Sequence, residues 1–368
     1  MTITIDCRWI DASGVGVYLR ECLPFFLDSA HSFFLLGSPE KLAPLVSEKK
    51  NAAILNCSVK PFSLTELFTF PKKLLNEINS GDLYYSPYFN IPGFIKTPVY
   101  TTIHDIIFPD MPELTSRLGL ATRMWFYRRA FKKSRIIFTV SEFSKSRIEH
   151  YSQTKVPVIV THSAIQPHLL YKSESARPEK KKIILFIGNI KKHKGLSILM
   201  EAFLRARQEG LDYNLSVVGS RENFRSKDLN LSTINDGSIE FTGLISNEKL
   251  TEILKEASLL VQPSLYEGFC LPPLEALISG TPALISDIPV LREIYSEYPL
   301  KAIGRELPVH WFTAGDTMNL KEKLLLLLHN KKPSSIRHDP ETEELYTFEK
   351  TSRAILETLC KQSALEKK

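Results

Sequence analysis

The 368-residue sequence lacks several patterns that mark particular classes of protein. Its five cysteines are widely spaced and include no Cys-x-x-Cys pair, which argues against a disulfide framework and against a cysteine-based zinc site. No apolar run approaches the roughly 20 residues that span a bilayer. The first residues have neither the basic nor the apolar region of a secretion signal. We therefore expect a soluble protein of the reducing cytosol, at most peripheral to a membrane.

Charge and metal-binding patterns are also sparse. The net charge of +6 is too small to imply nucleic acid by itself, but it suits an anionic small ligand or an anionic membrane surface. There is no Asp-x-Asp triplet and no His/Asp cluster with metal-ligand spacing. We therefore expect no nucleic-acid partner, no bound metal and no cofactor.

What the sequence does contain is a regular alternation of strand and helix patterns, which predicts parallel sheets covered by helices on both faces, an α/β fold. The length suits two domains. A helix is expected over Val17–Leu27. The strands expected in the first half are Thr2–Asp6, Ser32–Leu36, Ala53–Cys57, Leu83–Tyr85, Val99–Ile103, Ile136–Val140 and Val158–Val160.

A charged stretch without apolar periodicity, residues 171–182, is typical of a linker between domains. We expect Rossmann-like domains at 1–170 and 183–345, facing each other across a cleft, and a terminal helix within Glu341–Leu365. That last segment, 346–368, can return to the first domain. The second domain's expected strands are Ile183–Ile187, Leu215–Val218, Ile239–Phe241, Leu259–Gln262 and Ala283–Ser286, and its expected helices are Leu196–Gln208, Glu248–Ala257 and Pro273–Ser279.

The strongest chemical signal is Glu267-Gly-Phe-Cys-Leu-Pro-Pro-Leu-Glu275, which follows an expected strand. Pro272 and Pro273 suit the first positions of a helix, because the missing N–H is not needed there. Glu275 then falls in the first helical turn. The two carboxylates can accept hydrogen bonds from sugar and ribose hydroxyls, while free N–H groups and the helix dipole can hold a phosphate. A solvated loop and helix is the alternative.

In this motif and in several others, over nearly its whole length, the sequence resembles glycosyltransferase family 4, retaining enzymes of the GT-B fold. The resemblance implies that Glu267 contacts the donor sugar and Glu275 binds the ribose. It also implies that backbone amides of Phe269, Cys270 and Leu271 contact sugar and diphosphate. The family often has glycine where Cys270 stands, a mild departure because only the backbone is expected to act there.

The second motif is Gly188-Asn-Ile-Lys-Lys-His-Lys-Gly195, a basic loop between an expected strand and helix. Lysines here can neutralise a diphosphate leaving group, although a solvated basic turn is the alternative. Lys194 matches the family's lysine. Asn189 stands where the family often has arginine. Related bacterial surface-polysaccharide transferases also carry asparagine after the equivalent of Gly188. Lys191 can supply the second charge.

Two further motifs are expected in the first domain. Ser13-Gly-Val-Gly16 fails as a dinucleotide fingerprint because Leu19 stands at the third glycine position, which disfavours a dehydrogenase. We expect it to form a turn, and the resemblance implies a donor-phosphate loop with Gly14 as the best candidate and Gly16 beside it; a plain tight turn is the alternative. His104 ends an expected strand, and the resemblance places it near the donor sugar; a buried structural histidine is the alternative.

Four smaller expectations concern the nucleobase, one loop, one helix cap and a membrane contact. Leu244 and Ile245 follow an expected strand and, by the resemblance, face the nucleobase. Asp105 organises its loop, and Ser141 caps a helix. The segment Arg117–Arg135 combines basic and aromatic residues, which suits an anionic membrane surface or an ordinary helix with one solvated face.

Together these patterns predict a metal-independent, retaining glycosyltransferase of bacterial surface-polysaccharide (O-antigen or lipopolysaccharide) biosynthesis. We assign the catalytic roles to His104, Lys194 and Glu267. The donor is a nucleotide sugar, with GDP-mannose the first choice, and the acceptor is a glycan or polyprenyl-linked oligosaccharide. A GT-B sugar-nucleotide epimerase and a catalytically silent nucleotide-sugar-binding subunit are the alternatives.

Overall fold

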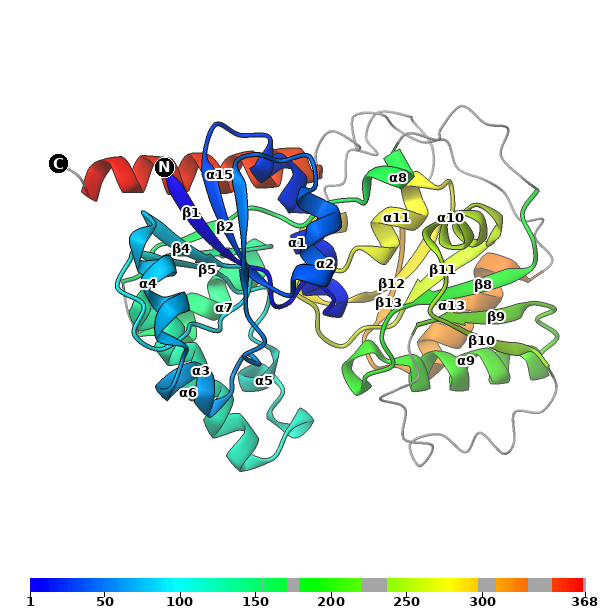
Figure 1. Cartoon of the computed structure of the whole chain (residues 1–368). Helices are drawn as coiled ribbons and strands as arrows, with labels where there is room; N and C mark the ends of the chain where they lie inside the picture. Colours follow the sequence, from blue (N-terminus) through cyan, green and yellow to red (C-terminus); the bar gives the residue numbers. More distant parts are fainter. Residues whose placement is uncertain (154, 171–178, 220–236, 297–308, 330–345, 367–368) are drawn as a thin grey trace. The chain divides into compact units, whose positions relative to one another are not determined.

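A computed structural model describes residues 1–153, 155–170, 179–219, 237–296, 309–329 and 346–366 (Figure 1). The chain divides into two compact units. Unit 1 comprises Met1–Ala164 and Tyr346–Lys368, and unit 2 comprises Ile165–Leu345. Each unit is an open, fully parallel sheet with helices packed on it, which confirms the expected α/β class and the Rossmann-like character of both halves.

The described strands of unit 1 form a sheet in the order β3-β2-β1-β4-β5-β6-β7. They are β1 (Thr2–Asp6), β2 (Ser32–Gly37), β3 (Ala52–Asn56), β4 (Leu83–Ser86), β5 (Val99–Thr102), β6 (Ser134–Thr139) and β7 (Val158–Val160). The order reverses between β1 and β4, where Ile3 pairs with Leu83. In open parallel sheets this reversal leaves a crevice beyond the carboxyl ends of the strands.

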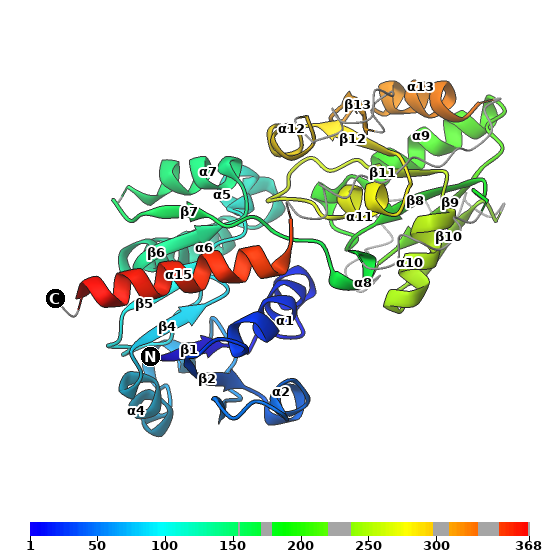
Figure 2. The same ribbon diagram turned by 90° about the horizontal axis from the view of Figure 1, so that it is seen from above.

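Helices cover both faces of the unit 1 sheet. They are α1 (Ser13–Leu27), α2 (Pro39–Val46), α3 (Leu64–Phe68), α4 (Lys72–Ser80), α5 (Ile107–Asp110), α6 (Arg117–Lys133), α7 (Glu142–Ser152) and α15 (Phe348–Glu366), with a 3-10 turn at Pro112–Leu114. Strand residues alternate between faces, so Tyr85 packs with Phe26 of α1 and Phe348 of α15. Tyr84 packs on the other face with Ile78 of α4. Figures 1 and 2 show α15 lying beside α1.

Unit 2 repeats the pattern with a sheet whose described strands run β10-β9-β8-β11-β12-β13. The strands are β8 (Ile183–Ile187), β9 (Asn214–Val218), β10 (Ile239–Gly243), β11 (Leu259–Gln262), β12 (Ala283–Asp287) and β13 (Val309–Thr313). The helices are α8 (Pro167–Leu170), α9 (Leu196–Gln208), α10 (Asn247–Glu256), α11 (Pro272–Ile278), α12 (Pro289–Tyr295) and α13 (Thr317–Leu328), with a 3-10 turn at Lys192–Lys194. Here the strand order reverses between β8 and β11.

Serine caps explain where several helices begin. The hydroxyl of Ser141 accepts a hydrogen bond from the Ser144 N–H at 3.0 Å, as the sequence predicted. Ser63, Ser116 and Ser246 cap α3, α6 and α10 in the same way. Each hydroxyl pairs one of the N–H groups that a first helical turn leaves without an intrahelical partner.

One local prediction was wrong. The segment Ser13–Gly16 does not form a turn before a helix at Val17, because α1 already begins at Ser13 and Ala12 is the extended residue before it. The glycine at position 16 has a packing reason, since an added Cβ would lie 2.6 Å from the Ile10 carbonyl oxygen. At Gly14 an added Cβ would meet nothing within 4 Å.

The expected linker and the end of the chain are described in part. Residues 171–178 of the expected linker lie outside the described residues, and so do residues 341–345 of the expected terminal helix. Lys180 is buried, and its ammonium group donates to the Lys255 carbonyl oxygen at 2.9 Å and to the Thr281 hydroxyl. This part of the expected linker is therefore anchored to unit 2. The terminal helix α15 packs on α1 and belongs to unit 1.

Candidate active site

The loop that joins β8 to α9 carries the predicted basic motif. Gly188 directly follows β8 and donates its N–H to the Val218 carbonyl at 2.9 Å. Asn189 is half-buried, Lys191 is exposed, and Lys194 ends the 3-10 turn. Gly195 has a φ of +69°, and a Cβ there would lie 1.9 Å from the Pro263 carbonyl oxygen. Only glycine lets this loop lie so close to the loop after β11.

The loop after β11 carries Glu267, whose side chain is only 7% exposed. Gln262, the last residue of β11, donates to the Ser264 hydroxyl at 2.9 Å. That hydroxyl in turn donates to Glu267 Oε1 at 2.6 Å. The Leu265 N–H donates to the His193 carbonyl at 2.7 Å, which ties this loop to the one after β8.

Lys194 and Glu267 form a buried ion pair between these two loops. Lys194 Nζ lies 2.7 Å from each carboxylate oxygen of Glu267. Burial alone would raise the pKa of Glu267, but the Lys194 charge and the hydrogen bonds from Lys194 and Ser264 hold it below its ordinary value. The Lys194 side chain remains 22% exposed, so its charge is accessible from solvent.

Glu275 is a second buried carboxyl group with a very different environment. It lies in the first turn of α11 and is 4% exposed. Burial raises its pKa to about 7, which a hydrogen bond from Gln166 opposes only in part. Gln166 Nε2 is 3.4 Å from Glu275 Oε1, a long contact. Glu275 therefore exchanges its proton near neutral pH.

Between the two glutamates, the chain turns sharply at Cys270, which adopts a φ of +75°. This left-handed conformation explains why glycine suits the position and why a side chain there is strained. The Tyr295 hydroxyl donates to the Cys270 carbonyl and fixes the turn. Leu271 precedes α11, whose first residues are Pro272 and Pro273 as the sequence predicted. Phe269 is buried beside the turn.

The loop after β10 exposes an apolar side chain at this edge. Gly243 ends the strand with a φ of +72°, and its carbonyl accepts the Gly219 N–H at 3.0 Å. Leu244 is 80% exposed and Ile245 half-buried. Because β10, β9, β8 and β11 are consecutive neighbours in a parallel sheet, these loops all leave its carboxyl edge. The Lys194–Glu267 pair bridges the loops at the strand-order reversal, where ligands of such sheets bind.

The predicted residues of unit 1 lie at the carboxyl edge of the other sheet. His104 follows β5, and its Nε2 lies 3.0 Å from the Pro87 carbonyl oxygen. The Tyr18 ring packs edge-on against the imidazole, with centroids 4.8 Å apart. Withdrawal from water lowers the pKa of His104 to about 4, so its imidazole is neutral at pH 7. Gly14 is exposed in the first turn of α1.

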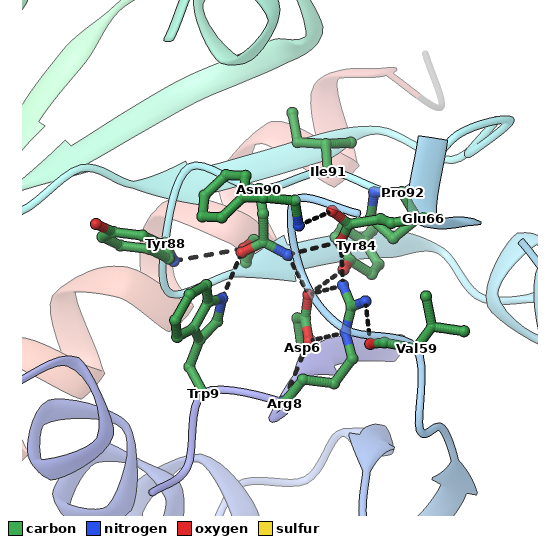
Figure 3. Close-up of polar contacts among 12 residues, drawn as sticks. Asp6, Arg8, Trp9, Val59, Glu66, Tyr84, Tyr88, Asn90, Ile91 and Pro92 are labelled. Carbon is green, nitrogen blue, oxygen red and sulfur yellow. Dashed lines mark hydrogen bonds and ion pairs between the residues drawn. The ribbon is translucent and has the colours of Figure 1, made fainter. Parts of the chain in front are cut away.

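Two features escaped sequence reasoning. His193 lies inside the basic motif, and burial together with the neighbouring Lys194 charge lowers its pKa to about 4. A buried network in unit 1 joins Asp6, Arg8, Glu66 and Asn90 (Figure 3). No sequence motif predicts that network, because its members are up to 84 residues apart. Only the Asp-x-Arg spacing at the end of β1 is a local signal.

The described part of the chain contains neither a metal-binding cluster nor a membrane-spanning helix. No group of three or more His, Cys, Asp or Glu side chains there is arranged to hold a metal ion. Within the same part of the chain, every helix is too short or too polar to cross a membrane. All five cysteines are free thiols.

Residues 170–339 match the model of the family described as glycosyl transferases group 1. The chain is 27% identical over 232 residues to O-antigen chain mannosyltransferase B of Escherichia coli, which covers 60% of this chain and 61% of that protein. It is 28% identical over 205 residues to O-antigen chain mannosyltransferase RfbU of Salmonella typhimurium, covering 52% and 53%. The chain thus spans about half to three-fifths of the length of these two curated relatives.

Solved structures resemble the whole chain. Anabaena Alr3699/HepE in complex with UDP and glucose superposes with a TM-score of 0.71 at 15% identity, over 98% of this chain and 100% of that one. Sucrose-phosphate synthase from Thermosynechococcus elongatus gives a TM-score of 0.71 at 15% identity, over 99% and 100%. The chain therefore has the GT-B fold, its residues 170–339 resemble the group 1 glycosyl transferases, and its sequence resembles the O-antigen mannosyltransferases.

Proposed function

We propose that this protein is a glycosyltransferase that moves a hexose from a nucleoside-diphosphate sugar to a glycan or lipid-linked oligosaccharide. The observation that carries the proposal is the buried Lys194–Glu267 pair at the strand-order reversal of unit 2. A buried ion pair contributes little to stability, so a part-exposed lysine held against a carboxylate at a ligand-binding edge favours a functional role.

In this proposal three ionisable side chains of unit 2 each bind a different part of the donor. Lys194 turns its exposed ammonium toward the diphosphate and stabilises the charge that grows as the leaving group departs. Glu267 then accepts hydrogen bonds from donor sugar hydroxyls, kept ionised by Ser264 and the remaining lysine contact. Glu275 accepts hydrogen bonds from the ribose hydroxyls, which replace its long contact to Gln166.

Backbone and apolar groups complete the proposed donor site. Gly188, Asn189 and Lys191 line the diphosphate from the loop after β8, and the amides of Phe269, Cys270 and Leu271 line it from the loop after β11. The exposed Leu244 side chain, with Ile245, packs on the nucleobase. In unit 1, Gly14 leaves open space for a phosphate, whereas Gly16 is already explained by packing. Neutral His104 accepts or donates a hydrogen bond near the reaction centre.

The proposal includes retention of the anomeric configuration and catalysis without a metal ion. Glu267, the carboxylate beside Lys194, is engaged by Lys194 and Ser264, and the proposal assigns it to binding of sugar hydroxyls and not to nucleophilic attack. We therefore favour a same-face displacement in which the departing diphosphate helps to deprotonate the acceptor, with retention of configuration. Lysine and the α11 N-terminus supply the positive charge that a divalent ion supplies elsewhere.

Mannose from GDP-mannose is the proposed donor sugar, supported by the names of the two O-antigen mannosyltransferase relatives. A screen of GDP-, UDP- and dTDP-sugars for thermal stabilisation tests the choice. A new nucleotide sugar formed from donor alone would indicate an epimerase. Donor binding without any transfer to a panel of acceptors would indicate a silent binding subunit.

We also propose that unit 1 rests on an anionic membrane through an apolar-basic surface. Its exposed apolar side chains are Leu64, Phe68, Phe94, Leu118 and Trp125, and its exposed basic ones are Arg117, Arg128, Lys132 and Lys133. Helix α6 contains no acidic residue. Phe62, just before α3, meets Phe126 of α6 edge-on with ring centroids 4.7 Å apart. Arg129 of α6 donates to the Pro92 carbonyl at 3.0 Å, and the Gly93 N–H donates to the Glu66 carbonyl of α3 at 2.8 Å, so α3, α6 and the 91–94 turn pack together. Basic side chains around exposed apolar ones complement anionic lipid headgroups.

A further inference from the structure

A buried charge network lies at the carboxyl edge of the unit 1 sheet, below the reversal between β1 and β4. Arg8 Nη2 lies 2.6 Å from Asp6 Oδ2 and 2.6 Å from Glu66 Oε1. Both carboxylates are fully buried, and the Arg8 side chain is 3% exposed. Burial disfavours an ionised Asp6, but Arg8 and hydrogen bonds from Tyr84 and Asn90 hold its pKa below the ordinary value.

Asn90 connects this network to an indole ring. Its Nδ2 donates to Asp6 Oδ2 at 2.9 Å and to Glu66 Oε1 at 3.0 Å, which consumes both amide hydrogens. Its Oδ1 therefore points away from the two carboxylates and accepts the Trp9 Nε1–H at 2.6 Å (Figure 3). The buried charges thus fix the amide, and the amide fixes the plane of the Trp9 ring.

Trp9 belongs to a group of half-buried aromatic rings. The Tyr88 ring meets it edge-on at a centroid distance of 4.9 Å, and Phe62 lies 5.7 Å away. Tyr88 in turn lies 6.4 Å from the His104 ring. Trp9, Tyr88 and Phe62 are each only partly covered by the described chain.

Burying this charge network costs more free energy than an apolar core at the same place would. Burying two carboxylates and a guanidinium contributes little stability compared with apolar packing, even when every group is paired. What the network supplies is a fixed orientation for one partly exposed indole at the sheet edge where open α/β sheets bind ligands. Aromatic walls with a few fixed polar groups are typical of small-molecule sites.

We propose that Trp9 and Tyr88 form a platform for the terminal hexopyranosyl ring of the acceptor, and that Asn90 is the positioning residue that holds the indole. This inference rests on the proposed glycosyltransferase function, which assigns most donor contacts to unit 2 and, in unit 1, assigns only Gly14 and His104. The C–H face of a pyranose is weakly positive and apolar, so it packs on the negative face of an aromatic ring.

Fluorescence of Trp9 tests the platform directly. The chain has three tryptophans, so the Trp125→Phe/Trp311→Phe variant leaves Trp9 as the single indole. Titration with α-linked mannotriose, or with octyl glycosides of mannose, glucose and galactose, is expected to change its emission saturably with at least one probe. Unchanged Trp9 emission with every glycoside would overturn the platform, as would a change caused by nucleotide sugar but by no glycoside.

Kinetics separate the ring from its positioning. With the best glycoside acceptor, Trp9→Ala is expected to raise the acceptor KM roughly tenfold, the cost of one aromatic contact. Trp9→Phe restores part of the loss. Asn90→Leu keeps the Trp9 ring but frees it, so KM rises while donor affinity does not change. Trp311→Ala, which removes a half-buried indole of β13 in unit 2, is the matched control. An acceptor KM unaffected by Trp9→Ala would contradict the assignment.

The test also separates this inference from the proposed function. If no nucleotide sugar binds but mannotriose changes the Trp9 emission, the glycosyltransferase proposal fails and the sugar platform stands. If a nucleotide sugar binds and no glycoside perturbs Trp9, the platform fails and the proposed function stands.

Discussion

Lys194 Nζ lies 2.7 Å from both carboxylate oxygens of Glu267, and the pair joins the loops after β8 and β11. These strands are neighbours at the point where the strand order of unit 2 reverses. The sequence separates the two residues by 73 positions, and the sheet topology brings them together. The proposed donor chemistry depends on this relationship.

Removing one member of the pair is expected to affect stability and turnover separately. Lys194→Ala leaves a buried, uncompensated carboxylate, so the free energy of unfolding should fall by about 3 kcal/mol, with turnover falling strongly. The double variant Lys194→Ala/Glu267→Gln lacks the uncompensated carboxylate charge. It should recover most of the stability but none of the turnover. Denaturant unfolding and initial rates measure the two effects.

Lys182→Ala provides the control for that comparison. Lys182 pairs with Asp212 at 2.6 Å, but both side chains are exposed, so its removal should change stability little and turnover not at all. A double variant that regains full turnover would contradict the role of Lys194.

Donor affinity is expected to depend on pH through Glu275. Its pKa is about 7, and ribose hydroxyls donate hydrogen bonds to the ionised form, so donor binding should release a proton. Affinity should therefore rise as the pH is raised through about 7 and level off above it. Calorimetry in buffers of different ionisation enthalpy measures the released proton. Nucleotide sugars themselves do not titrate in this range.

Glu275→Gln should abolish that pH dependence and bind donor more weakly. His104 and His193 both have a pKa of about 4 and do not contribute near neutral pH. A pH dependence that persists in Glu275→Gln would assign the proton to another group.

Two glycines with the same backbone conformation offer a matched test of loop packing. Gly195 and Gly237 have φ values of +69° and +70°, but a Cβ meets the Pro263 carbonyl only at Gly195. Gly237→Ala should lose about 1 kcal/mol from backbone strain alone. Gly195→Ala should lose more and also weaken donor binding, because the loops after β8 and β11 must separate. Equal losses of stability and no change in donor binding would show that their contact is dispensable.

Membrane association is expected to require both parts of the apolar-basic surface. Wild-type protein should sediment with phosphatidylglycerol vesicles, less so with added salt, and not with phosphatidylcholine alone. Phe68→Ser/Trp125→Ser should weaken binding, whereas Leu326→Ser, an exposed apolar residue of unit 2, should not. Equal sedimentation of all variants would remove this surface from the proposal.

Product stereochemistry and metal dependence form a further prediction. The anomeric configuration of the donor should be retained in the product, as measured by NMR, and EDTA should leave the rate unchanged. An inverted product would exclude the same-face displacement, and loss of activity restored by a divalent cation would exclude charge neutralisation by lysine alone.

Much of the fold could be predicted because its strands are short, apolar and regularly separated by helical patterns. The strands Ile183–Ile187 and Leu259–Gln262 were predicted to the residue. The Ser13–Gly16 segment was not, because Gly16, which favours a turn locally, is here required by the carbonyl oxygens of Trp9 and Ile10 packed against α1. Such a contact is invisible in a local pattern.

The sequence predicted those parts of the candidate site that depend on residues adjacent in the chain. The sequence placed Glu275 correctly in the first turn of a helix that begins at Pro272, since proline position alone indicates that start. The Asp6–Arg8–Glu66–Asn90 network could not be predicted, because Glu66 and Asn90 lie far from Asp6 and Arg8 in the sequence, and the Asp-x-Arg spacing alone does not indicate them. Likewise, the raised pKa of Glu275 follows from burial, which spacing does not reveal.

The most direct test of the account is calorimetric titration of the protein and of Glu275→Ala with GDP-, UDP- and dTDP-sugars. One nucleotide class should bind the wild type, and Glu275→Ala should bind it at least about tenfold more weakly, the cost of lost hydrogen bonds to a charged group. Absence of binding by every nucleotide sugar, or equal affinity in Glu275→Ala, would contradict a donor site built on unit 2.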